Sequence, residues 1–181
     1  MKILFVRHGK TKSNALGRVM SRSNDESLSE EGLAVVQQVV SESPIEFDVL
    51  YSSPLKRTHE TALEFSKKYA KTVALHDAIL EQDFGSLSNK TWEEINEITK
   101  GEVTHALWQT IEEIDFSAYG GETKEDVRSR LASFIGHVKQ QHAGSVPLVV
   151  THGGVLRVMY ALYPNHAPKS IGNVSIHEFE V

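Results

Sequence analysis

The stretch Ile3-Leu4-Phe5-Val6-Arg7-His8-Gly9 joins a short apolar run directly to polar residues and a glycine. A run of four apolar residues that stops at a charge is typical of a buried strand entering a loop. A second stretch of this kind, Leu148-Val149-Val150-Thr151, runs into His152-Gly153-Gly154. In an open α/β sheet, ligands bind beyond the carboxyl ends of the parallel strands. The two stretches therefore predict that His8 and His152 meet at one edge of a sheet.

Strand-like and helix-like segments alternate along the rest of the chain. Further strands are expected at residues 49–51, 72–75 and 173–181. Helices are expected after the capping residues Ser29, Ser53-Pro54 and Thr123. Further helices are expected from Thr91 and Trp92 onward, around residues 103–111, and over residues 155–162. This alternation predicts an α/β fold, a three-layer α/β/α sandwich whose central sheet is mainly parallel. We expect residues 1–181 to form a single domain.

Length, charge and composition restrict the class of function. The chain has 181 residues, which suits one domain, and it has no cysteine, which excludes disulfides, thiolate metal sites and a cysteine nucleophile. Its net charge of −5 argues against a general nucleic-acid binder, because such proteins are usually basic. The apolar run at the N-terminus is too short for a signal peptide, and no run approaches the roughly 20 residues of a membrane span. We expect a cytoplasmic protein that binds neither nucleic acid nor membrane.

Reactive side chains follow four of the expected strands. Arg7 and His8 follow the first strand, Arg57 lies in the first turn of the helix after the second, Glu81 lies past the third, and His152 follows the fourth. Arginine presents a planar, permanently charged fork that suits a phosphate dianion. A neutral imidazole can attack phosphorus, and a carboxylic acid can protonate the leaving oxygen. The set predicts phosphoryl transfer with all five residues as catalytic groups.

Glycines at two of these strand ends suggest further contacts. Gly9 and the Gly153-Gly154 pair lack side chains, so the backbone there is expected to approach a bound anion closely. No metal ion is expected in the pocket, since Arg7 and Arg57 would repel a cation. Lys10 is either a solvated charge or a contact to an anionic substrate, and both readings stay open.

Five motifs occur in order from about residue 3 to residue 175, and together they resemble the histidine phosphatase superfamily, the phosphoglycerate-mutase-like proteins. No single motif is specific, but the ordered set is. The motifs are Arg7-His8-Gly9, Ser52-Ser53-Pro54 with Arg57, Leu80-Glu81 before Phe84-Gly85, Gly120-Gly121-Glu122-Thr123, and Thr151-His152-Gly153-Gly154.

This resemblance implies roles for individual residues. His8 would be the phosphorylated nucleophile and Glu81 the proton donor and acceptor. Asn14 falls where the family often has an asparagine that contacts phosphate, and we expect Thr11 and Gly153 to line the substrate site with it. The family fold is a mixed sheet between helical layers, and no metal is required. We expect this chain to need no cofactor. The chain departs from the family pattern, outside the phosphate pocket, at Lys10, Ser21, Ser27 and residues 86–89.

The predicted function is a phosphatase that hydrolyses a small phosphate monoester through a phosphohistidine on His8. A phosphoglycerate-type mutase is one alternative, but the mutases of the resembled family carry longer insertions than the short stretch between Gly85 and Gly120. A non-catalytic phosphate-binding module is the other, although it would not need both His8 and Glu81. The sequence determines neither which ester is bound nor the oligomeric state.

Overall fold

A computed structural model of the chain describes residues 1–108, 114–166 and 170–181. Within these residues five strands form one sheet in the order β3-β2-β4-β1-β5. The pairs β1–β4, β2–β4 and β2–β3 are parallel, whereas β5 runs antiparallel to β1 at one edge. The predicted mixed, mainly parallel sheet is therefore confirmed. The strands are β1 Lys2–Arg7, β2 Val49–Ser52, β3 Val73–Leu75, β4 Pro147–Thr151 and β5 Ile176–Glu180.

The predicted helices are found, with differences at their ends. Ser29 and Thr123 each accept a hydrogen bond from the first turn of their helix, as their positions predicted, and Thr91 does the same. The helix expected around residues 103–111 begins at His105, and residues 109–111 lie outside the described part of the chain. The α-helices are α1 Lys12–Ala15, α2 Glu30–Glu42, α3 Lys56–Tyr69, α4 Trp92–Ile98, α5 His105–Trp108, α6 Lys124–Gln141 and α7 Gly153–Leu162. Short 3₁₀ turns are η1 Asp77–Ile79, η2 Gly85–Leu87 and η3 Ser117–Tyr119.

The predicted Ser53-Pro54 cap of α3 is wrong. Helix α3 begins at Lys56, and its N-cap residue, Leu55, makes no side-chain capping bond. The amide of Ser53 instead donates to Val150 O at 3.1 Å, which extends the strand pairing beyond β2. Because the chain stays extended here, the helix starts later, and Arg57 still lies in its first turn.

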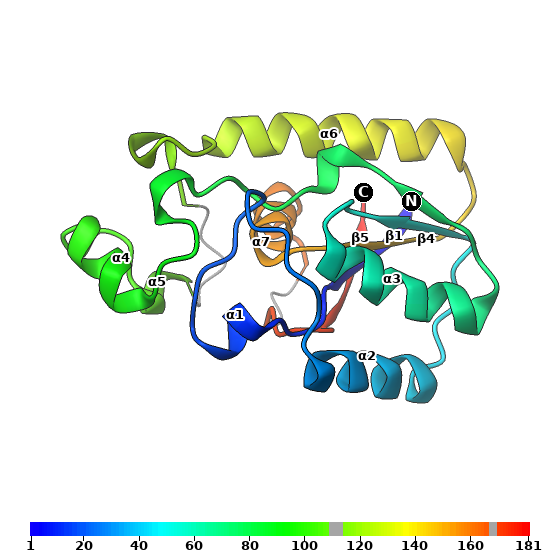
Figure 1. Cartoon of the computed structure of the whole chain (residues 1–181). Coiled ribbons are helices and arrows are strands. Elements are labelled where there is room, and N and C mark those ends of the chain that lie inside the picture. Colours follow the sequence, from blue (N-terminus) through cyan, green and yellow to red (C-terminus); the bar gives the residue numbers. More distant parts are fainter. Residues whose placement is uncertain (109–113, 167–169) are drawn as a thin grey trace.

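Helices cover both faces of the sheet, which makes the three predicted layers. Figure 1 shows α6 on one side of the sheet and α2 on the other. Alternate residues of β1 serve the two layers: Ile3 and Phe5 pack with α6 and α7, while Leu4 and Val6 pack with α2 and α3. Strand β1 is thus buried on both faces, as expected for a strand inside a parallel sheet.

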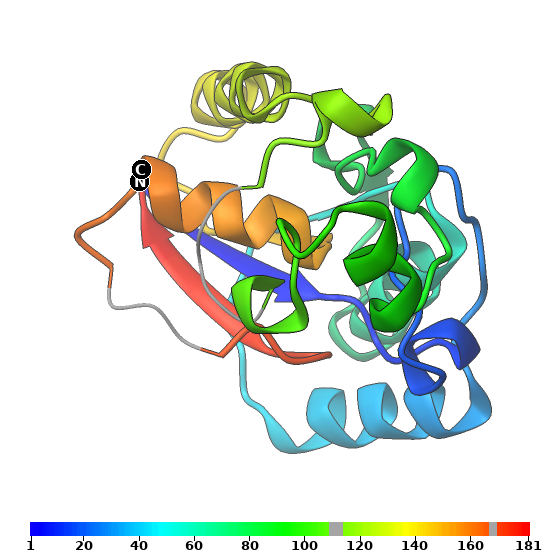
Figure 2. The same ribbon diagram turned by 90° about the vertical axis from the view of Figure 1, so that its left-hand side faces the viewer.

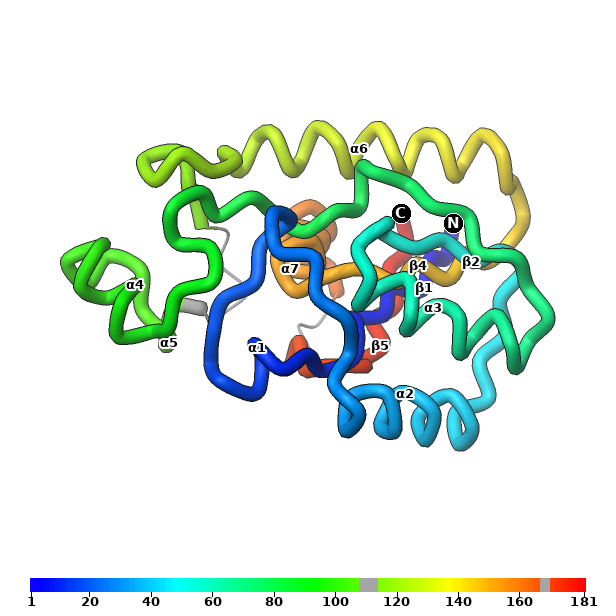
Figure 3. Tube along the Cα trace, viewed as in Figure 1, coloured from blue at the N-terminus to red at the C-terminus, as the bar shows by residue number. Residues whose placement is uncertain are grey.

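Beyond the carboxyl ends of the strands, loops and short helices pack into a third apolar cluster. Its fully buried members include Phe84, Ile95 and Phe116. Val19, in the loop after α1, joins this cluster and exchanges backbone hydrogen bonds with the segment at Asn89. Figure 3 shows that loop lying beside the chain between η1 and α4. These segments form a wall at the edge of the sheet where the strand ends meet.

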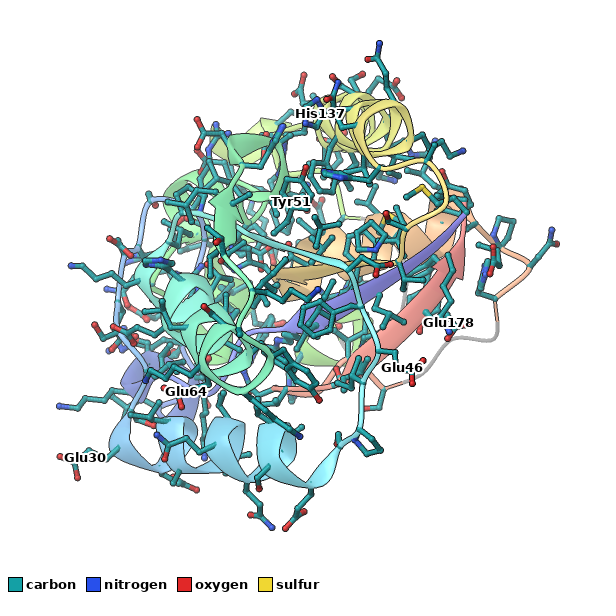
Figure 4. The ribbon with its side chains drawn as sticks, turned by 90° about the vertical axis from the view of Figure 1, so that its right-hand side faces the viewer. Glu30, Glu46, Tyr51, Glu64, His137 and Glu178 are labelled. Atoms are coloured by element: carbon teal, nitrogen blue, oxygen red, sulfur yellow. The ribbon has the colours of Figure 1, made fainter. Side chains whose placement is uncertain are left out.

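Both termini and many acidic side chains lie at the outside. Figure 2 shows the two chain ends side by side, and Met1 N lies 2.9 Å from Val181 O. In Figure 4 the exposed Glu30, Glu46 and Glu178 lie at the periphery of the fold. Among the helices described in residues 1–108, 114–166 and 170–181, none has the length and apolarity needed to cross a membrane.

Candidate active site

The histidines that follow β1 and β4 lie side by side. Their ring centroids are 5.3 Å apart, and the rings are tilted by 60°. Strands β1 and β4 are parallel neighbours that pair Arg7 with Thr151, so the chain delivers His8 and His152 to the same place. Both side chains are almost completely buried. The expected meeting of the two strand ends is observed.

The surroundings of His8 determine which ring nitrogen can react. Its Nδ1 lies 2.7 Å from Gly9 O. A carbonyl oxygen only accepts hydrogen bonds, so Nδ1 carries the proton and the lone pair is on Nε2. Burial, with help from the charges of Arg57 and Arg7, holds the pKa of His8 well below its usual value. The ring is therefore neutral near neutral pH, as a nucleophile must be.

The backbone around His8 is fixed by residues just before β5, which the sequence predicted only as part of a strand over residues 173–181. Val174 N donates to Arg7 O at 3.0 Å, and Asn173 Nδ2 donates to His8 O at 3.0 Å. Val174 adopts φ +59°, a left-handed conformation that is unfavourable for a β-branched residue. Such strain persists only where surrounding contacts impose it. The segment before β5 thus fixes the backbone of the proposed nucleophile.

Three buried side-chain nitrogens at the site have no partner within the described residues. They are the buried nitrogens Arg7 Nε, Arg57 Nε and His152 Nδ1. Each arginine is anchored through another nitrogen: Arg7 Nη1 donates to Ile171 O at 2.7 Å, and Arg57 Nη1 donates to Asn24 O at 2.6 Å. Buried polar atoms without a partner are rare in proteins. A ligand with several acceptor oxygens, such as a phosphate group, would satisfy all three.

Glu81 lies against the N-terminus of α7. Its carboxylate accepts hydrogen bonds from Gly154 N at 3.0 Å and from Gln82 N at 2.9 Å. A Cβ atom on Gly154 would collide with Glu81 Oε1, so only glycine allows this approach. The side chain is 4% exposed. Gly154 therefore accommodates the side chain of Glu81, whereas the sequence led us to expect a bound ligand anion there.

Gly9 and Gly153, the other two glycines at the strand ends, have different surroundings. Gly9 N donates to Thr61 Oγ1 at 3.0 Å, and a Cβ atom there would press on Val36 of α2. The expectation that Gly9 approaches an anion is wrong, because its amide is already bonded and its small size serves helix packing. A Cβ atom on Gly153 would lie 3.6 Å from Arg7 Nε, which places this residue beside one of the unpaired nitrogens. Its role in substrate binding stays a prediction.

Thr11 and Asn14 form the cap of α1. Thr11 Oγ1 accepts from Asn14 N at 3.2 Å, and Asn14 Oδ1 accepts from Thr11 N at 3.3 Å. The buried Thr11 hydroxyl thus has a structural role, whereas the amide NH₂ of Asn14 is the group suited to phosphate. Lys10 is partly exposed, and its Nζ lies 3.6 Å from a carboxylate oxygen of Glu31. This surface pair favours a solvated charge at Lys10.

Two polar residues of the site were missed or undervalued at the level of sequence. Arg157, on α7, is 7% exposed, and burial lowers its pKa to about 10, against the opposing influence of Glu81. A single charge in an otherwise apolar helix was the available signal. Ser53 Oγ lies 2.9 Å from His152 Nε2 and holds that ring. In the described part of the chain, no cluster of three or more His, Asp or Glu side chains could hold a metal ion.

Comparison with known proteins assigns the family. The sequence profile of the histidine phosphatase superfamily (branch 1) matches residues 3–181. The chain belongs to the histidine phosphatase superfamily. Phosphoserine phosphatase 1 of Hydrogenobacter thermophilus is 34% identical, over 88% of this chain and 74% of its own length. Metal-independent phosphoserine phosphatase of Arabidopsis thaliana is 32% identical, over 88% of this chain and 67% of its own length.

Solved structures confirm the fold. Bacillus stearothermophilus YhfR superposes with a TM-score of 0.82 at 24% identity, over 99% of this chain and 91% of that one. The phosphoserine phosphatase of Entamoeba histolytica in complex with 3-phosphoglyceric acid superposes with a TM-score of 0.79 at 25% identity, over 99% and 90%. The family and the fold class predicted from the motifs are both confirmed.

Proposed function

We propose that this histidine phosphatase superfamily member hydrolyses phosphate monoesters through a phosphohistidine on His8. The observation that carries the proposal is a neutral imidazole, that of His8, beside His152 and under the influence of two arginines, with three buried nitrogens of these neighbours left unpaired. The family match, and the phosphatases among the relatives, support hydrolysis of a phosphoric monoester. The sequence motifs predicted the same class of enzyme.

In the first step, Nε2 of His8 attacks phosphorus and the bond between phosphorus and the leaving oxygen breaks. Protonated Glu81 gives its proton to that oxygen, so the product leaves as an alcohol. Arg7, Arg57 and His152 donate hydrogen bonds to the non-bridging oxygens as charge shifts onto them. The phosphorylated ring is a cation, and Gly9 O, which faces Nδ1–H, stabilises it.

In the second step, water attacks the phosphorus atom of the phosphohistidine. The Glu81 carboxylate accepts a proton from that water, and the N–P bond breaks. Inorganic phosphate leaves, His8 returns to its neutral form, and Glu81 is again protonated. All five predicted catalytic residues take part, and neither a metal ion nor a cofactor is required.

The substrate we propose to test first is phosphoserine. Two relatives that share about a third of their residues with this chain carry that name. Phosphoglycerate and sugar phosphates belong in the same panel, since the walls of the pocket differ from the family pattern at residues 86–89. A cytoplasmic location agrees with such substrates and stays a prediction.

Turnover of that panel by two variants tests the proposal. His8→Ala removes the nucleophile and abolishes phosphate release, whereas a chelator leaves the rate unchanged. His137→Ala, which alters an exposed histidine on α6, serves as the matched control and keeps full activity. Full activity in His8→Ala would contradict the scheme. Isomerisation of phosphoglycerate without release of phosphate would favour a mutase, and binding without turnover would favour a non-catalytic module.

A further inference from the structure

The Gly120-Gly121-Glu122 motif takes no part in the two-step scheme, yet it lies at the edge of the site. Glu122 is only 8% exposed, which is unusual for a carboxylate. Arg130 of α6 faces it with two nitrogens: Nε lies 3.1 Å from Oε1, and Nη2 lies 3.1 Å from Oε2. Two parallel bonds of this kind restrict both side chains in position and orientation.

This ion pair holds the chain on both sides of Glu81. Arg130 Nη1 donates to Leu80 O at 2.8 Å, directly before Glu81. Glu122 Oε2 accepts from Asp83 N at 2.9 Å, two residues after Glu81. The segment that carries the proposed general acid is therefore held at one end by Arg130 and at the other end by Glu122.

Glycines make this arrangement sterically feasible. A Cβ atom on Gly121 would collide with Asp83 O, and one on Gly85 would collide with Tyr119 O. Gly85 also adopts φ +54°, where residues with side chains are strained. The close approach lets Glu122 N donate to Asp83 O at 2.9 Å. Glycines from two of the five sequence motifs thus allow the Glu122 segment to pack directly against the Glu81 segment.

Arg22 adds to the cluster but is less constrained. Its Nη1 lies 3.1 Å from Glu122 Oε1, and its Nε lies 3.1 Å from Asp83 Oδ2. The Arg22 side chain is 40% exposed, whereas that of Arg130 is 16% exposed. Exposed ion pairs contribute little, because solvent screens them. Arg130 is therefore the partner that fixes Glu122.

We propose that Arg130 and Glu122 are positioning residues that hold Glu81 at the leaving oxygen of the substrate. Neither contacts the reacting atoms. The inference rests on the proposed role of Glu81 as the general acid. A general acid must come within about 2.6–3.2 Å of the oxygen that it protonates. A misplacement of about 1 Å costs on the order of 10²-fold in rate.

Substrates with different leaving groups distinguish a role in positioning Glu81 from general support of the fold. An alkyl phosphate releases a strongly basic oxygen that needs a proton, whereas p-nitrophenyl phosphate releases a stable phenolate that does not. The ratio kcat/KM covers the reaction only as far as departure of the leaving group, so later hydrolysis of the phosphohistidine does not enter. Loss of positioning therefore lowers kcat/KM for the alkyl ester selectively.

The experiment compares phosphoserine, or the best alkyl ester of the panel, with p-nitrophenyl phosphate. We expect Arg130→Gln and Glu122→Gln each to lower kcat/KM for the alkyl ester by about 10²-fold and to leave that for p-nitrophenyl phosphate nearly unchanged. In the double variant, kcat/KM for the alkyl ester should be no lower than in the less active of the two single variants, because the two side chains act as a unit. Lys139→Gln, an exposed charge on the same helix, should change neither substrate.

The Glu81→Gln variant distinguishes failure of the positioning inference from failure of the proposed function. If this variant shows the selective loss and the Arg130 and Glu122 variants lose both substrates equally, the positioning inference is overturned and the proposed function stands. If Glu81→Gln shows no selectivity, the general-acid role fails and the inference fails with it. Activity on p-nitrophenyl phosphate reports that a variant is folded. Should Arg130→Gln not fold, Glu122→Gln, which keeps the shape of its side chain, decides the result.

Discussion

At the scale of single residues, His8 owes its neutral state to burial and nearby arginines, and the position of its proton to the carbonyl of Gly9. Arg7, His8, Arg57, Glu81 and His152 could be named from the sequence because each follows an expected strand of a sheet that the alternation of elements predicts to be mainly parallel. The proton on Nδ1 of His8 could not be predicted, since it depends on how the ring turns toward a neighbouring carbonyl. The Glu122–Arg130 pair joins side chains from different elements and has no local signature.

The two neighbouring glycines of α7 give a sharp prediction at this scale. Gly154→Ala places a Cβ atom against Glu81 Oε1, while Gly153→Ala meets only ordinary contacts. Because both variants gain the helix propensity of alanine, we expect Gly154→Ala to have a free energy of unfolding about 1–3 kcal/mol lower than that of Gly153→Ala, through overpacking. Urea unfolding of both variants provides the measurement. Equal stabilities would show that Glu81 does not need this glycine.

At the scale of elements, local signals predicted helix starts well where the capping residue and its partner are close in sequence. Thr123 and Asp126 form the expected capping box at the start of α6. The start of α3 was misplaced because a long-range bond from Ser53 to Val150 keeps the chain extended. Such a bond leaves no trace in the nearby sequence.

Helix α6 provides the prediction at the scale of elements. Thr123→Ala removes the hydrogen bond from Asp126 N to Thr123 Oγ1, which measures 3.0 Å. We expect the free energy of unfolding to fall by about 0.5–2 kcal/mol. Thermal unfolding checks this against Ser133→Ala, which changes an exposed serine in the middle of the same helix. A loss no larger than that of the control would mean that the cap contributes nothing.

At the scale of the whole molecule, a chain of net charge −5 holds two arginines, Arg7 and Arg57, close enough to His8 to lower its pKa. The two main apolar clusters lie on opposite faces of one sheet, so we infer a single domain over residues 1–181, as the sequence suggested. The alternation of strand-like and helix-like apolar patterns predicted the class of fold. It could not predict the substrate, because the wall beyond the strand ends is built from loops whose positions depend on tertiary packing.

Two buried neutral histidines make stability depend on pH. Burial and nearby arginines hold the pKa values of His8 and His152 well below 6.5. Below about pH 6.5 the unfolded chain binds protons that the folded protein does not, so stability falls as the pH falls. Each group contributes up to about 1.4 kcal/mol per pH unit. Urea unfolding between neutral and mildly acidic pH measures the slope, which should be shallower in His8→Asn. An identical slope in that variant would contradict the assignment.

The measurement that tests the account most directly is the search for phosphate on His8 during turnover. The enzyme is mixed rapidly with substrate and denatured at alkaline pH, where phosphohistidine is stable, and its peptides are then examined by mass spectrometry. The account predicts phosphate on the peptide that contains His8, and none on the same peptide of His8→Ala. Steady release of phosphate while His8 remains unmodified at every time point would contradict it.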